Sequence, residues 1–150
     1  MGKFPGAGRG ILSINLFTKQ INSDKITKTY ISPREAVLHM CEEKIKAVTK
    51  QFARTMKDIY GDLLRDVILY GSCARGDFTE ESDIDVMVLL DIPQEEIGEA
   101  RRIILEISNR LDLENDVVLA PVIQNYLIYQ KYIPVSSFYQ NVKKEGVRIA

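Results

Sequence analysis

Two acidic residues, Asp83 and Asp85, begin a segment that runs to Leu90 and is otherwise apolar and rich in β-branched residues. This composition predicts a buried strand. Because side chains alternate along a strand, both carboxylates point to the same side of the sheet, where they repel each other. Mg²⁺ takes oxygen ligands of this kind, and substrate phosphates usually complete its coordination. The pair therefore predicts a divalent-cation site.

A phosphate site is predicted a short distance upstream. The segment Asp66–Tyr70 has the pattern of a strand and runs directly into Gly71 and Ser72. Gly71 has no Cβ, so a ligand can approach its backbone, and the hydroxyl of Ser72 can form a hydrogen bond to that ligand. If a helix begins after Ser72, its N–H groups and its dipole also favour an anion. Together these features predict a site for the triphosphate of a nucleotide.

The spacing of these two patterns resembles a known signature. Gly71-Ser72 is followed by ten residues and then by Asp83-x-Asp85, which is similar to the motif of the polymerase-beta-like nucleotidyltransferase superfamily. The inner Ala74-Arg75-Gly76 and Ser82 resemble the small single-domain branch, the minimal nucleotidyltransferases. The resemblance extends over most of the chain, from about residue 33 to residue 150.

The resemblance implies a reaction and a set of site residues. A nucleoside monophosphate is transferred to a hydroxyl group and pyrophosphate leaves. The preferred expectation is AMP, with ATP as the donor. Two Mg²⁺ ions clamp the attacking and leaving oxygens of an in-line displacement. Asp83 and Asp85 hold both ions, and the expected nucleotide-binding residues are Gly71, Ser72, Arg75 and Ser82. For Arg75 an ion pair with an acid such as Asp77 is the competing interpretation.

The superfamily needs a third carboxylate on a later strand, across from the first pair. The run from Leu113 to Ile123 has the pattern of that strand, and Asp116 is the acid inside it. Asp116 is therefore the expected third metal ligand, which could also take the proton of the acceptor. Asp112 and Glu114 are the alternatives if the strand starts earlier. Asn115 before Asp116 departs from the apolar flank that is common in relatives.

The group that accepts the nucleotide is implied by the family resemblance, and no residue of this sequence identifies it. Minimal nucleotidyltransferases often pair with a helical protein of the HEPN type, as antitoxins that add nucleotides to the toxin. The expected acceptor is then a hydroxyl group of a protein, and a tyrosine side chain is the leading candidate. The alternatives are a small-molecule transferase of the aminoglycoside kind and a nucleotide-binding module that acts by contact without catalysis. The candidate docking surface, for the partner or for a second copy, consists of aromatic residues near the C-terminus: Tyr126, Tyr129, Tyr132 and Phe138. The alternative is that these residues pack in the core.

Length, charge and cysteine content limit the class of protein. The chain has 150 residues, enough for one domain with a core of its own, and its 20 basic and 21 acidic side chains give a net charge of −1. This balance disfavours a long nucleic acid as partner. Two cysteines without paired metal spacing, and the lack of a long apolar run, predict a cytoplasmic protein without a membrane helix.

The remaining pattern predicts an α/β (α+β) fold, with a short mixed sheet and helices packed mainly on one face, and the resemblance implies that this is the nucleotidyltransferase fold. Residues 1–31 are expected to be a separate N-terminal arm, flexible or forming an extra edge strand, and residues 32–150 the nucleotidyltransferase domain. Ser32, Pro33 and Glu35 have the pattern of a capping box that starts a helix ending near Gly61. Further helices are predicted over Pro93–Leu111 and over Ser136–Gly146.

Overall fold

The computed structural model describes residues 32–150, and the predictions for the N-terminal arm lie outside these residues. Four strands form one sheet in the order β3-β2-β1-β4. Their bounds are β1 Leu64–Leu69, β2 Ile84–Leu90, β3 Leu119–Asn125 and β4 Val147–Arg148. The pairs β1–β2 and β1–β4 are antiparallel and β2–β3 is parallel, so the sheet is mixed as predicted.

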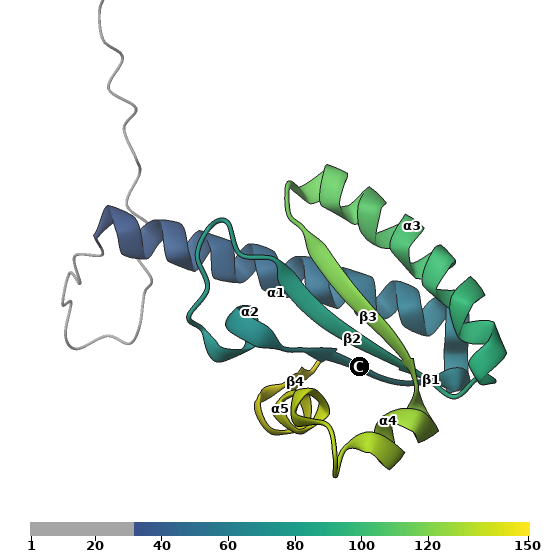
Figure 1. Cartoon of the computed structure of the whole chain (residues 1–150). Coiled ribbons are helices and arrows are strands. Elements are labelled where there is room, and N and C mark those ends of the chain that lie inside the picture. The colour runs from purple at the N-terminus through teal and green to yellow at the C-terminus, as the bar shows by residue number, and fades with distance from the viewer. Residues whose placement is uncertain (1–31) are drawn as a thin grey trace, which may run out of the picture. The chain divides into compact units, whose positions relative to one another are not determined.

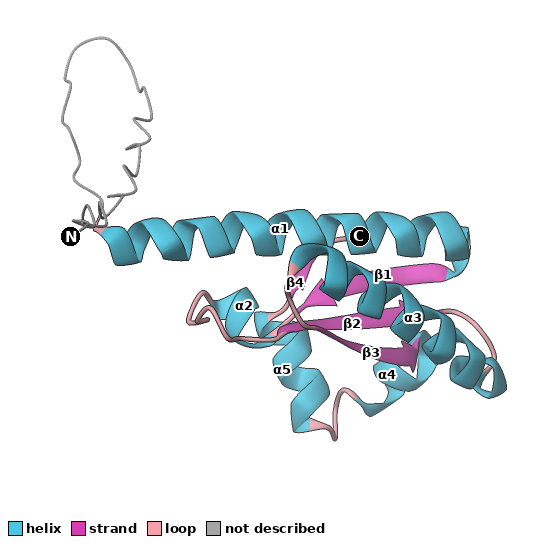
Figure 2. Cartoon of the chain, turned by 90° about the horizontal axis from the view of Figure 1, so that it is seen from above, coloured by secondary structure: helices cyan, strands magenta, loops and turns pink. Residues whose placement is uncertain are grey.

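Helices cover both faces of the sheet (Figures 1 and 2). The long helices α1 (Pro33–Tyr60) and α3 (Ile97–Asn115) bury one face, around Phe52, Met56 and Ile104. The shorter helices α4 (Tyr126–Tyr132) and α5 (Ser137–Glu145) cover part of the other face, where Tyr129 and Val142 pack on Met87 and Leu89. The predicted fold class is confirmed, and the second face has more helical cover than the sequence indicated.

Capping residues fix the ends of the helices. Ser32 accepts a hydrogen bond from the N–H of Glu35, whose side chain accepts one from the N–H of Ser32, so the predicted capping box is present. Helix α1 ends at Tyr60, and Gly61 follows with a positive φ of 52°. Ser136 caps α5, as the sequence predicted.

One predicted strand boundary is wrong. Residues 113–115 belong to the last turn of α3, and β3 begins only at Leu119. Asp116 ends the helix in the left-handed conformation, with φ 52°, and its carbonyl oxygen accepts a hydrogen bond from Nζ of Lys44, 2.9 Å away. Leu113, Glu114 and Asn115 therefore belong to the helix, where Leu113 is exposed, and do not start a strand. The sequence also gave no prediction for α4 or for the two-residue strand β4.

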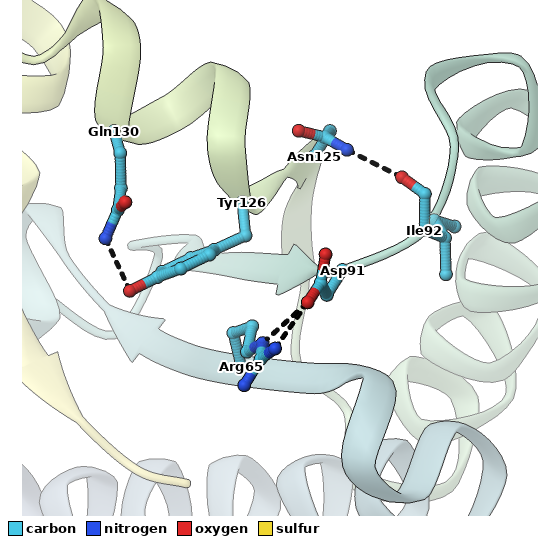
Figure 3. A network of polar contacts seen from close by, with 6 residues as sticks. All are labelled: Arg65, Asp91, Ile92, Asn125, Tyr126 and Gln130. Carbon is cyan, nitrogen blue, oxygen red and sulfur yellow. Dashed lines mark hydrogen bonds and ion pairs between the residues drawn. The ribbon is translucent and has the colours of Figure 1, made fainter.

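A polar network fixes the end of the sheet that lies farthest from Gly71 (Figure 3). Nδ2 of Asn125 donates to the carbonyl of Ile92 at 2.6 Å, while its Oδ1 accepts from the N–H of Ile128 and caps α4. Arg65 pairs with Asp91, joining the start of β1 to the end of β2. These bonds anchor the turn from β3 into α4, which starts the chain on its path across the second face.

The outer edge of β3 is poorly suited to pairing with another strand. The N–H of Ile84 donates to the carbonyl of Val118, so the backbone groups of alternate residues starting at Leu119 point away from β2. The outward N–H of Leu119 donates to Oδ1 of Asp112, and that of Asn125 to the side chain of Gln124. Pro121 has no N–H. Within β3, only Ile123 is left with an outward donor, which protects this edge from strand addition.

Candidate active site

The register of the sheet places the predicted site residues in one row. Leu69 pairs with Val86, and one residue further the N–H of Tyr70 donates to the carbonyl of Asp85 at 2.9 Å. On the other side, Asp85 pairs with Ala120 of β3. In-register neighbours point to the same face, so Ala120, Asp85 and Tyr70 lie side by side across three strands. Asp83 lies two residues before Asp85, which gives it the same direction.

This row lies on the face that α4 and α5 cover in part. Val86 and Val88, which alternate with Asp85, are buried under α1 and α3, whereas Met87 packs with Val142 of α5. Asp83 is exposed and Asp85 is half-buried. The two acids therefore lie at the open end of a face whose other end is closed by helices.

Gly71 brings the predicted phosphate site into contact with the acids. It begins α2 (Gly71–Arg75), a helix of five residues, and has a φ of +70°. A Cβ built on Gly71 would lie under 3.0 Å from Oδ2 of Asp85 and 3.3 Å from its Cγ. Only glycine combines this backbone conformation with such a close approach to the carboxylate.

The carboxylate of Asp85 is in an unfavourable environment for a negative charge. Burial raises the pKa of Asp85, the charge of Asp83 raises it further, and Arg75 opposes both. The same row affects Tyr70, where burial and then the charge of Asp85 raise the pKa of the phenol to about 12. A cation bound between the two acids would remove this electrostatic penalty, so the donor set fits a hard divalent ion.

The other predicted nucleotide-binding residues make structural contacts. Ser72 is the second residue of α2 and is half-buried, and Tyr70 is the residue that precedes the helix. Oγ of Ser82 accepts a hydrogen bond from the N–H of Thr79 at 2.8 Å and closes the turn before Asp83. Nε of Arg75 lies 3.3 Å from Oδ2 of Asp77, which matches the ion-pair interpretation, and its Nη1 lies 3.8 Å from Glu145 of α5.

The three candidates for a third carboxylate lie around the end of α3. Asp116 is exposed and outside β3, and Glu114 is an exposed residue of the last helical turn. Asp112 is half-buried. Burial raises the pKa of Asp112, the hydrogen bond from Leu119 lowers it, and the charge of Asp83 raises it. Asp112 is thus the candidate that interacts electrostatically with the pair.

The strand positions next to the acids carry no acid. Ala120 lies beside Asp85, and the alternation of β3 puts Val118 beside Asp83. Within residues 32–150, no group of three or more His, Cys, Asp or Glu side chains is arranged to hold a metal ion. The sequence could not reveal this, because it depends on where β3 begins and on its register with β2.

Cys73 is partly buried and packs against the core under α1 and α3. Sγ of Cys73 donates to the carbonyl of Asp83 at 3.4 Å, and burial raises the pKa of its thiol, in keeping with a packing role. Between residues 32 and 150, every helix is too short or too polar to cross a membrane.

Comparison with known proteins gives a family. The family model described as a nucleotidyltransferase domain matches residues 49–149. Two proteins of Methanocaldococcus jannaschii, both named "Putative protein adenylyltransferase", are 37% and 34% identical over 107 residues. Each alignment covers 71% of this chain, and it covers 99% of the first relative and 96% of the second.

A solved structure was also found, that of a chain in the toxin–antitoxin complex MntA–HpeT. It covers 67% of this chain and 72% of its own length, with 16% identity and a TM-score of 0.43. A likeness at this level does not decide between functions. The family match spans two thirds of the chain, including every site residue described above, and the first relative is matched over nearly its whole length. The chain belongs to the nucleotidyltransferase domain family and is a nucleotidyltransferase.

Proposed function

We propose that the protein transfers AMP from ATP to a hydroxyl group of a partner protein. The observation that carries this proposal is the contact between Gly71 and Asp85, which puts a backbone suited to phosphate against the acid pair. The names of the two Methanocaldococcus relatives describe transfer of an adenylyl group to a protein. Because this chain spans nearly the whole length of both, we assign it the same class of acceptor.

We further propose that Asp83 and Asp85 hold two Mg²⁺ ions together with the triphosphate. Mg²⁺ is typically bound by one or two carboxylates plus substrate phosphates, and two carboxylates on one face supply such a set. Bound there, the ions supply charge stabilisation to the triphosphate and to the leaving pyrophosphate. Gly71 and Ser72 hold the β- and γ-phosphates, through the backbone N–H and the hydroxyl.

Two residues act on this site through their neighbours. Ser82 shapes the turn that leads into Asp83, so its contribution is to orient that carboxylate. Arg75 is held by Asp77 and Glu145, and its positive charge lowers the pKa of Asp85 through a coulombic interaction and not through an ion pair. Both belong to the nucleotide site as positioning residues.

We infer the direction of attack from the order of the strands. The phosphate site follows β1 and the acids lie on β2, so the leaving group points toward β1. In an in-line displacement the attacking oxygen enters from the opposite side. The acceptor hydroxyl therefore enters over β3, where Val118 is 53% exposed and Val122 is 36% exposed. Because the outer edge of β3 is protected, the acceptor makes contact with this face through side chains.

The identity of the third metal-binding acid is the next part of the proposal. Asp116 was the expected ligand, and its position at the end of α3 does not favour that role. Among Asp112, Glu114 and Asp116, we propose Asp112, because its carboxylate interacts with the charge of Asp83. Its second oxygen is available while Oδ1 accepts from Leu119. The acceptor proton passes to this carboxylate or to solvent.

For the partner we propose a helical protein of the HEPN type, with this chain as its antitoxin. The support is the resemblance of the Gly71–Asp85 signature to minimal nucleotidyltransferases. An aminoglycoside-like acceptor would need an acidic pocket. The described cavity of about 260 Å³ between β1, α4 and α5 contains Asp66, but this acid is paired with Arg148, and Lys143 also lines the cavity. Neither Asp83 nor Asp85 lines this cavity, so it does not support such an acceptor.

The test is transfer of label from nucleotide to protein. Purified protein is incubated with Mg²⁺ and ATP labelled at the α-phosphate, with and without the helical protein from the neighbouring gene, and pyrophosphate is measured in parallel. We expect labelled partner protein and stoichiometric pyrophosphate, both lost in Asp83→Ala. CTP, GTP and UTP serve as competitors. A further reaction contains kanamycin as a small-molecule acceptor. Labelled kanamycin with unlabelled protein would overturn the protein acceptor, and absence of any labelled product would overturn the AMP transfer itself.

A further inference from the structure

An exposed aromatic ring lies next to the catalytic row. Of the three phenylalanines in residues 32–150, Phe52 is fully buried, Phe78 is half-buried and Phe138 is 42% exposed. Phe138 belongs to the first turn of α5, and its ring meets that of Tyr70 edge to face at 5.6 Å between centroids.

We propose that Phe138, supported by Tyr70, is the platform on which the base of the bound nucleotide stacks. This inference rests on the proposed function, because it assumes that the triphosphate lies at Gly71 and the acids. It adds a subsite for the nucleobase to the phosphate and metal positions of the proposed function.

The position of Tyr70 connects this platform to the reacting phosphorus. Tyr70 is the neighbour of Asp85 in the row, on the side away from Ala120, and the residue directly before Gly71. A nucleotide held by Gly71 and the two acids therefore lies next to Tyr70, the residue that adjoins both Gly71 and Asp85. Phe138 packs edge to face on Tyr70 and extends the aromatic surface next to Asp85.

Two directions from the α-phosphorus are already assigned in the proposed function, one to the leaving group and one to the acceptor. The leaving pyrophosphate points to β1, and the acceptor enters over β3. The ribose must then leave along the strands or away from the sheet. One way along the strands leads to the loop before Asp83, which carries Asp77, Glu80 and Glu81. The other leads to α5, where the ring of Phe138 is exposed and packs on Tyr70. A neutral ring is a better surface for a base than a loop of three acids.

Helix α5 holds the platform in a fixed place. The phenol of Tyr139 accepts a hydrogen bond of 2.8 Å from Nε2 of Gln124 on β3, which ties the start of the helix to the sheet. Near its other end, Glu145 pairs with Arg75 of α2. The rings of Phe138 and Tyr139 also touch, at 5.6 Å between centroids. Because the helix is anchored at both ends, little entropy is lost when a base stacks on Phe138.

Stacking on such a ring has a measurable value. Base–aromatic stacking contributes about 1–3 kcal/mol per base, which corresponds to about 5- to 150-fold in affinity. Tripolyphosphate has the same charged groups as ATP without a base, so it separates stacking from phosphate binding. The chain contains no tryptophan, so a single substitution introduces a unique fluorescent reporter.

The experiment uses the variants Phe138→Trp and Tyr132→Trp in the full chain. Tyr132 is also an exposed aromatic, 45% exposed, but lies at the end of α4. Each variant is titrated with Mg²⁺ and a non-hydrolysable ATP analogue, and separately with Mg²⁺ and tripolyphosphate. We expect the analogue to quench the indole fluorescence of Phe138→Trp, while tripolyphosphate leaves it unchanged. Neither ligand should affect Tyr132→Trp.

Binding constants from calorimetry complete the test. In Phe138→Ala we expect the Kd of the ATP analogue to rise about 5- to 150-fold and the Kd of tripolyphosphate to stay within about twofold. Phe138→Leu keeps an apolar contact with Tyr70 and should lose nearly as much, which separates stacking from packing. If the wild type binds the analogue and these variants bind it equally well, the platform is refuted while the proposed function stands. If the wild type binds neither ligand, the proposed function fails with it.

Discussion

Gly71 and Asp85 lie in direct contact, so that a β-carbon on Gly71 would collide with the carboxylate of Asp85. Two segments separated by the whole of α2 and its following loop thus share one small volume. Asp85 is predicted to hold metal, and the backbone of Gly71 is predicted to hold phosphate. The two are adjacent because Gly71 has no side chain to separate its backbone from the carboxylate of Asp85.

Gly71→Ala should abolish AMP transfer and lower the free energy of unfolding by about 1–3 kcal/mol, because the added Cβ meets Asp85 and the backbone has a positive φ. Gly76→Ala is the matched control. Gly76 has a φ of +81°, but a Cβ there has no neighbour within 4 Å. It should lower stability in urea denaturation and keep activity. Equal activity in the two variants would show that the contact at Asp85 has no catalytic role.

Asp85→Asn should raise stability without metal while it abolishes activity. Burial and the charge of Asp83 raise the pKa of Asp85 above its ordinary value of 3.8, so the folded state disfavours its charged form. The contribution of this group to stability is therefore greatest below pH 3.8 and is lost as the pH rises through the raised pKa. We expect the variant to melt above the metal-free wild type at neutral pH, and the difference to shrink in acid.

Mg²⁺ should reverse that difference. A cation that binds the folded state alone stabilises it by mass action. In thermal melts at neutral pH, millimolar Mg²⁺ with an ATP analogue should raise the Tm of the wild type more than that of Asp85→Asn. Identical shifts for both proteins would argue that Asp85 is not a metal ligand.

Asp112→Asn and Asp116→Asn distinguish two candidates for the third acid. Asn is compatible with the left-handed backbone of Asp116, so this variant removes the charge and keeps the helix end. We expect Asp116→Asn to keep AMP transfer within about twofold and Asp112→Asn to reduce kcat by at least about 10-fold, as loss of a proton acceptor typically does. Since Asp112 also bonds Leu119, thermal melts must show that Asp112→Asn is folded at the assay temperature. The reverse order of activities would restore Asp116 as the third acid.

Ala120→Asp should strengthen metal binding. Ala120 lies beside Asp85 on the same face, about 4.8 Å away across the strands, where a third carboxylate could share an ion. We expect a lower Kd for Mn²⁺ in calorimetry, and lower stability without metal because three acids then repel. Ala120→Asn is the neutral control of nearly equal volume. A Kd that is the same in both variants would contradict the derived row of residues.

Much of the fold followed from local signals. The capping box at Ser32, the end of α1 at Gly61 and the cap at Ser136 each depend on residues a few positions apart. Helix α4 was missed, although Asn125 caps it, because the apolar pattern of Tyr126–Tyr132 is too short to distinguish it from a loop. Strand β4 has two residues and exists through its pairing with β1, which no local pattern encodes.

For the site, the sequence by itself determined the acid pair and the Gly71-Ser72 motif, because their chemistry depends on residue type and on a spacing within one stretch of chain. Only the tertiary structure decided what lies beside that pair. The register of β2 with β3 puts Ala120 and Val118 there, and the left-handed end of α3 places Asp116 elsewhere. Strand register and helix length are set by packing between distant segments, whereas a short motif carries its own geometry.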